Sequence, residues 1–140
     1  MKSRILIVDD EWEFTSLLKK RLESVGYYRV QEENNPRAAA QAARDFLPDL
    51  IVMDVMMPYQ DGAEVAAAIR ADHRLGHVPI LFVTALVSGD HRIDGEYSGN
   101  QQYLPKSLTL GRLLDHIEQK LKLAHCAMVN ASTPSRLLTA

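Results

Sequence analysis

The sequence predicts an α/β fold in which a five-stranded parallel sheet carries helices on both faces. Apolar runs of strand length alternate with stretches of helical periodicity five times over about 120 residues, as in parallel strands joined by right-handed crossovers. Most of these runs are apolar at nearly every position, which is typical of strands buried on both faces. The length of 140 residues, 46% of them hydrophobic, suits one domain with a substantial core.

The first strand and the first helix are marked by a change of period. Residues 4–8 are almost all apolar and end in the acidic run 9–11. Apolar residues then recur at helical spacing from Phe14 to Val25, and Gly26 supplies the stop. We therefore expect a buried strand followed by an amphipathic helix.

The next strand and helix precede the central strand of the sequence. Residues 29–32 form a weak strand, which we expect near an edge of the sheet. Residues 36–46 are rich in alanine and helical in pattern, with Asn35 as a plausible N-cap. Residues 50–53 are then an apolar run too short for a helix, and Asp54 follows them directly.

The third helix and the fourth strand follow a turn. Asp61 and Gly62 are typical turn residues, and residues 63–71 have the pattern of a helix. Residues 79–84 read as a fourth buried strand. The pattern weakens over residues 86–101, where three glycines allow only a marginal helix, because each internal glycine costs about 1 kcal/mol relative to alanine.

The last strand and the last helix complete the domain. Residues 102–105 form a short fifth strand and residues 110–124 have a helical apolar stripe. Residues 125–140 show no clear period and include several small polar residues. We therefore assign residues 3–124 to the domain and residues 125–140 to a flexible tail or the start of a linker.

The charge balance excludes several classes of function. A formal net charge of −2, from 16 basic and 18 acidic residues spread along the chain, leaves no basic patch for nucleic acid or anionic lipid. The only cysteine is Cys126, which rules out an internal disulfide. No apolar run approaches the length of a membrane span and no export pattern is visible. We expect a cytoplasmic domain with no direct contact to nucleic acid or membrane.

Reactive side chains follow the predicted strands. In a parallel α/β sheet the carboxyl ends of all strands lie along one edge, where ligands bind. Five side chains are therefore expected to meet in one cleft: Asp9, Asp10, Asp54, Thr84 and Lys106.

Three carboxylates in one cleft require cations. Two unit charges about 4 Å apart repel by roughly 4 kcal/mol at an effective dielectric of 20. Lys106 can supply one positive charge, and a hard divalent ion such as Mg²⁺, which prefers oxygen ligands and retains waters, can supply the rest. Such a site suits phosphoryl transfer, and Asp54 is our candidate nucleophile, which would form an aspartyl-phosphate.

With these residues in place, the chain closely resembles the receiver domain of two-component response regulators (CheY-like) over about residues 3–124. The joint pattern is specific, although each part alone is weak. It includes the 22-residue spacing from Thr84 to Lys106. The segments that carry the resemblance are residues 7–11, Asp54 with Met57-Pro58 and Asp61-Gly62, residues 79–85, and residues 103–106.

The resemblance implies a flavodoxin-like (βα)5 fold with strand order 2-1-3-4-5 and a role for each site residue. Asp54 would accept a phosphoryl group from a phosphohistidine on a sensor histidine kinase or a histidine phosphotransfer protein. Asp10 and Asp54 would bind Mg²⁺ or Mn²⁺ directly, the backbone carbonyl of Met56 would be a further ligand, and Asp9 would act mainly through water. The domain would catalyse only its own phosphorylation and dephosphorylation.

The resemblance also implies a switch. Lys106 would pair with the phosphoryl oxygens and Thr84 would donate a hydrogen bond to one of them, and Tyr103 would rotate into the space that Thr84 leaves. The surface formed by the fourth helix, fifth strand and fifth helix would change and signal to a downstream protein or a fused output domain. This surface is also a candidate homodimer interface. The family usually has proline after its lysine, where this chain has Ser107, and a cis bond before a non-proline residue costs about 2.5–4 kcal/mol.

Two alternatives compete with this interpretation. Phosphatases of the haloacid dehalogenase type also use a strand-end aspartate with Mg²⁺, but they require an acid two residues later, where this chain has Met56. The other alternative is a degenerate receiver, an interaction module that works without phosphorylation. Ser107 supports it, and the presence of all five site residues opposes it.

Overall fold

The computed structural model describes residues 1–85, 96–98 and 101–132, which form one sheet flanked by helices. Its strands and helices have the following bounds: β1 Ser3–Val8, α1 Trp12–Ser24, β2 Tyr28–Glu33, the 3-10 helix η1 Pro36–Ala38, α2 Ala39–Phe46, β3 Leu50–Asp54, α3 Gly62–Arg70, β4 Ile80–Thr84, β5 Glu96–Ser98, β6 Gln101–Pro105 and α4 Leu110–Ser132.

The sheet has the predicted topology. Its order is β2-β1-β3-β4-β6-β5, and β6 is the fifth strand expected from the sequence. The first five strands of this order are all parallel, which confirms the order 2-1-3-4-5. The order reverses direction at β1 and β3, so their carboxyl ends flank the topological switch point at which ligands bind in such sheets.

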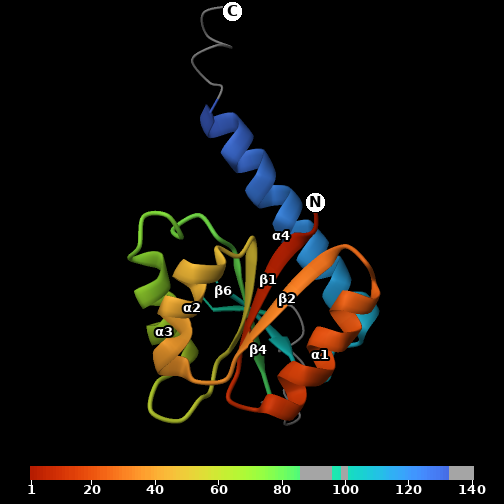
Figure 1. Cartoon of the computed structure of the whole chain (residues 1–140), viewed down its shortest axis with the longest axis vertical. Helices are drawn as coiled ribbons and strands as arrows, with labels where there is room; N and C mark the ends of the chain where they lie inside the picture. The colour runs from red at the N-terminus through yellow and green to blue at the C-terminus, as the bar shows by residue number, and fades with distance from the viewer. Residues whose placement is uncertain (86–95, 99–100, 133–140) are drawn as a thin grey trace, which may run out of the picture.

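Both faces of the sheet are covered by helices, as predicted (Figure 1). On one face, residues from α2 and α3 pack with Leu6, Met53 and Phe82 of the strands. On the other face, residues from α1 and α4 pack with Ile5, Val52 and Leu81. Because successive strand residues point to opposite faces, the continuous apolar runs fill both of these cores.

The local signals in the sequence act as predicted. Gly26, which follows the C-cap of α1, has a φ of 94°, a conformation that glycine adopts without strain. The side chain of Asn35 accepts a hydrogen bond from the backbone N–H of Arg37 and caps η1. The predicted helix over residues 36–46 is divided into η1 and α2, so its first turn is tighter than expected. The weak strand over residues 29–32 is β2, at the edge of the sheet.

Two predictions near the C-terminus require correction. The helix predicted to end at Ala124 continues to Ser132 as α4, because neither glycine nor proline interrupts the sequence between Ala124 and Pro134. Within the stretch predicted as a marginal helix, residues 96–98 form the edge strand β5, antiparallel to β6. The remainder of that prediction lies outside the described residues, and so does the predicted fourth helix.

Two further observations concern the peptide bond after Lys106 and the length of the helices. The peptide bond between Lys106 and Ser107 is trans. None of the helices that the structure describes has the length and apolar character needed to cross a membrane.

Candidate phosphoryl-transfer site

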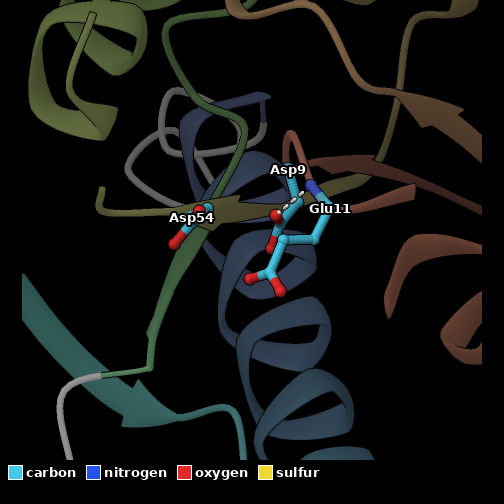
Figure 2. Close-up of side chains that lie close together, drawn as sticks. All are labelled: Asp9, Glu11 and Asp54. Carbon is cyan, nitrogen blue, oxygen red and sulfur yellow. Dashed lines mark hydrogen bonds between the residues drawn. The ribbon is translucent and has the colours of Figure 1, made fainter. Parts of the chain in front are cut away.

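The buried end of the site is formed by carboxylates from two adjacent strands. Asp9 directly follows β1 and is 0% exposed, and Asp54 is the last residue of β3 and is 3% exposed. Glu11 lies beside them, and its backbone N–H donates a 2.9 Å hydrogen bond to Oδ1 of Asp9 (Figure 2). Parallel pairing of β1 with β3 brings these acids together from positions 45 residues apart in sequence.

The loop after β3 holds Asp54 through close backbone packing. The backbone N–H of Gly62 donates a 2.9 Å hydrogen bond to the carbonyl of Val55. A Cβ atom at Gly62 would collide with the backbone carbonyl of Asp54. Asp61 caps α3 by accepting a 2.9 Å hydrogen bond from the backbone N–H of Glu64. The Asp61-Gly62 pair therefore lets α3 begin directly against the nucleophile candidate.

Lys106 supplies the positive charge in the cluster. It follows β6, and its backbone N–H donates a 2.8 Å hydrogen bond to the carbonyl of Thr84 at the end of β4. Its ammonium Nζ lies 2.7 Å from Oδ2 of Asp9, 2.6 Å from Oε1 of Glu11 and 3.5 Å from Oδ2 of Asp54. The trans bond to Ser107 therefore does not keep the ammonium out of the acidic cluster.

Burial and charge shift the proton affinities of this cluster. Burial, together with the charge of Asp9, raises the pKa of Asp54 to about 7, against the attraction of Lys106. Burial also raises the pKa of Asp9 above its ordinary value. For Lys106 burial acts in the opposite direction, but the carboxylates of Asp9 and Glu11 outweigh it and raise the pKa of the ammonium. In the absence of a metal, burial and the charge of Asp9 therefore favour the protonated form of Asp54.

The cluster fits a divalent metal ion. Oxygens of Asp9, Glu11 and Asp54 lie within 4.8 Å of one another. The buried Oδ2 of Asp9 is paired with the Lys106 ammonium at 2.7 Å. Carboxylate oxygens are the ligands that Mg²⁺ prefers. Three carboxylates and one ammonium leave an excess of negative charge that such an ion would balance.

Thr84 and Tyr103 lie on adjacent strands beside the acids. Thr84 is buried at the end of β4. Tyr103 is half-buried on β6, and its ring lies 5.6 Å from that of Phe82, centroid to centroid. A cavity of about 600 Å³ opens between Tyr103 and the loop after β3, which includes Met56 and Met57. The sequence-predicted residues therefore lie at one edge of the sheet, as expected.

Two further acids follow β1, Asp10 and Glu11. Asp10, expected as a direct metal ligand, is not among the three acids whose oxygens lie within 4.8 Å, although its charge contributes to the raised pKa of Asp54. Glu11, which the sequence explains as a helix-start residue, contacts Lys106 instead. Sequence reasoning missed this contact because an acid before a helix has an ordinary explanation in the helix dipole.

Comparison with known proteins identifies relatives of the chain. The model of the response regulator receiver domain family matches residues 5–118. Response regulator PleD of Caulobacter vibrioides is 41% identical over 109 residues, which are 77% of this chain and 24% of that protein. The phosphate regulon transcriptional regulatory protein PhoB of Pseudomonas aeruginosa is 33% identical over 118 residues, 84% of this chain and 51% of that protein. The chain thus spans a quarter to a half of the length of these two relatives.

Solved structures agree with these relatives. The non-phosphorylated HemR receiver domain of Leptospira biflexa matches with a TM-score of 0.67 and 31% identity, over 86% of this chain and 94% of that one. The chemotaxis protein CheY4 of Vibrio cholerae matches with a TM-score of 0.72 and 27% identity, over 85% of this chain and 98% of that one.

Proposed function

This chain belongs to the response regulator receiver family, and from that premise we propose that it accepts a phosphoryl group from a phosphohistidine onto Asp54. The observation that carries the proposal is the pairing of a buried strand-end carboxylate with a lysine from another strand. Asp54 is 3% exposed and lies 3.5 Å from the Lys106 ammonium. Burying a carboxylate is costly, and use of that carboxylate as a nucleophile accounts for its position.

The transfer exchanges one bond to phosphorus for another. A carboxylate oxygen of Asp54 forms the new O–P bond, and the P–N bond of the phosphohistidine breaks with its electron pair left on the imidazole nitrogen. Lys106 offsets the charge of the phosphoryl oxygens, and Thr84 donates a hydrogen bond to one of them. These residues have no other task in the step than to orient and stabilise the group.

A bound Mg²⁺ or Mn²⁺ would neutralise charge on the transferred group. Asp9, Asp10 and Asp54 are the candidate side-chain ligands, with the backbone carbonyl of Met56 as a further oxygen donor. The excess negative charge of the cluster supports this assignment. Glu11 lies close enough to take part.

The output is a change in the surface next to Tyr103. Thr84 would move toward the phosphoryl group and Tyr103 would rotate inward, which alters the surface formed by β6, the start of α4 and the segment before them. The predicted partners are a sensor histidine kinase or phosphotransfer protein and, downstream, a protein target, a fused output domain or a second copy. We place the receiver in residues 3–124, in the cytoplasm, with residues 125–140 as a tail or linker.

Incubation with phosphoramidate or acetyl phosphate and Mg²⁺ tests the proposal. Intact-mass measurement should find one added phosphoryl group on the wild type and none on the Asp54→Ala variant. Asp45→Ala, which removes an exposed aspartate on α2, is the matched control and should react like the wild type. No added mass on the wild type would support the degenerate receiver, and equal addition to Asp54→Ala would place the acceptor elsewhere.

Lys106→Ala separates phosphorylation from switching. Without the ammonium, Asp54 should still take up a phosphoryl group, because the nucleophile and the metal ligands remain. Phosphorylation should change the affinity of the variant for its partner by at most about a tenth of the change in the wild type. The reason is that charge-assisted bonds to the phosphoryl group drive the switch. Titration of a captured partner with the unphosphorylated and the phosphorylated protein measures this change. An equal change in the variant and the wild type would show that Lys106 takes no part in the switch.

A further inference from the structure

The ammonium of Lys106 contacts the acceptor Asp54 but lies closer to the acids that follow β1. Its Nζ is 2.6 Å from Oε1 of Glu11 and 2.7 Å from Oδ2 of Asp9, but 3.5 Å from Oδ2 of Asp54. The ring of Phe14, on the first turns of α1, lies 4.9 Å from the same ammonium. Three of its four nearest partners therefore come from the segment of residues 9–14.

Glu11 is the unexpected member of this group. It occupies the N-cap position of α1, yet its side chain makes no capping hydrogen bond. The carboxylate contacts Lys106, 95 residues away in sequence, instead. Its backbone is fixed by the 2.9 Å hydrogen bond from its N–H to Asp9, so the side chain extends from a defined point. Helix capping, the ordinary role of an acid at this position, does not account for the contact that the Glu11 carboxylate makes.

We propose that Glu11 is a positioning residue that holds the Lys106 ammonium toward the Asp9 side of the site, so that Glu11 competes with a phosphoryl group on Asp54 for Lys106. The inference rests on the proposed function and adds a residue that controls the rate of phosphorylation. The Glu11 side chain is 60% exposed while that of Lys106 is 11% exposed. Water can therefore solvate Glu11 once it is released, and the exchange is reversible because such exposed ion pairs are weak.

The proposed contact slows the reaction by competition. In transfer from phosphoramidate, a carboxylate oxygen of Asp54 bonds to phosphorus, and the P–N bond breaks with its electron pair on nitrogen, which leaves as ammonia. The phosphorus carries its oxygens and their charge into the site, where Lys106 would stabilise them. A Lys106 ammonium that is held by Glu11 at that moment is less available to the transferred group.

The test compares Glu11→Gln with Glu13→Gln, a matched control. Glu13 is an exposed acid in the first turn of α1, so its variant makes the same charge change two residues away. At saturating Mg²⁺, Glu11→Gln should be phosphorylated by phosphoramidate about two- to fivefold faster than the wild type, the factor that one exposed ion pair supplies. Glu13→Gln should match the wild type. Saturating Mg²⁺ removes any difference in metal affinity, and equal rates of all three proteins overturn the inference.

Two further variants distinguish the contact from a general charge effect. Glu11→Asp keeps the charge but shortens the side chain, so it should be as fast as Glu11→Gln, and a wild-type rate would contradict the contact. In the Lys106→Ala background, Glu11→Gln should have no effect, and a persisting acceleration would overturn the inference. A wild type that takes up no phosphoryl group at all would instead overturn the proposed function and this inference with it.

Discussion

At the scale of the residue, Asp54 is held in a state that costs stability. Its ordinary pKa of 3.8 is raised to about 7, chiefly by burial and by the charge of Asp9. In that range of pH the native state keeps a proton that the unfolded state has lost, so the free energy of unfolding falls as pH rises. Above the raised pKa, the folded domain carries the full cost of a buried carboxylate that Lys106 compensates only in part.

Asp54→Asn should therefore stabilise the metal-free domain in a pH-dependent way. The amide removes the buried charge and keeps the shape of the side chain, so the variant should be more stable than the wild type by about 2 kcal/mol at pH 8. The difference should nearly vanish at about pH 4, where Asp54 is protonated. Urea unfolding at both values measures it, with Asp45→Asn as the exposed control. A gain independent of pH would contradict the raised pKa.

Sequence reasoning could predict the position of a residue in the site where the sequence offered no ordinary structural explanation for the residue, or where the sheet topology fixed its place. Asp54 was predictable because a charge after an apolar strand demands a partner, and Lys106 because it follows another strand at the same edge. The contact of Glu11 with Lys106 was not predictable, since it depends on the direction of a side chain at the start of α1. That direction is set by the packing of β1 against β3 and by the backbone bond to Asp9.

At the scale of the element, the junction of β3 with α3 determines where Asp54 points. The turn signal of Asp61 and Gly62 was visible in the sequence, but the reason for the glycine was not. Only the structure places the start of α3 so close to the carbonyl of Asp54 that a side chain at Gly62 has no space. The junction thereby links the start of α3 to the position of Asp54, the proposed nucleophile.

Gly62→Ala should damage both stability and reactivity. The added methyl collides with the backbone of β3, so we expect a loss of about 1–3 kcal/mol in the free energy of unfolding and slower phosphorylation of Asp54. Gly111→Ala is the matched control, because nothing lies within 4 Å of an added Cβ at that helical position. It should leave stability unchanged or raise it by about 0.5–1 kcal/mol. Equal effects of the two substitutions would contradict the proposed role of this junction.

The regular elements were predictable where their pattern was strong. The three strands with continuous apolar runs, β1, β3 and β4, were found because burial on both faces requires such runs. The predicted end of the last helix was wrong. The apolar pattern stops after Ala124 because the helix no longer packs against the core there, and not because the helix ends. The absence of glycine and proline lets α4 continue to Ser132.

At the scale of the whole molecule, α4 extends beyond the body formed by the sheet and the other helices (Figure 1). Its first part carries Leu113 and Ile117 into the core next to α1. Residues 125–127 are exposed. The domain that we propose, residues 3–124, therefore contains the part of α4 that packs against the sheet.

A chain shortened after Ala124 should consequently keep the stability and the phosphorylation rate of the domain. Its unfolding temperature should change by no more than about 3 °C, the shift that corresponds to less than 1 kcal/mol for a domain of this size. A chain shortened after His116 removes Ile117, which is 0% exposed, and should fail to fold. Thermal unfolding of both proteins measures the boundary. A large drop in the unfolding temperature of the chain shortened after Ala124 would move the domain boundary toward Ser132.

The most direct test of the central claim is to locate the phosphoryl group. After reaction with phosphoramidate and Mg²⁺, reduction with borohydride converts an aspartyl-phosphate into homoserine, and peptide sequencing by mass spectrometry identifies the changed residue. Our account predicts homoserine at position 54 and nowhere else in the chain. Conversion at another aspartate, or full phosphorylation with position 54 unchanged, would contradict it.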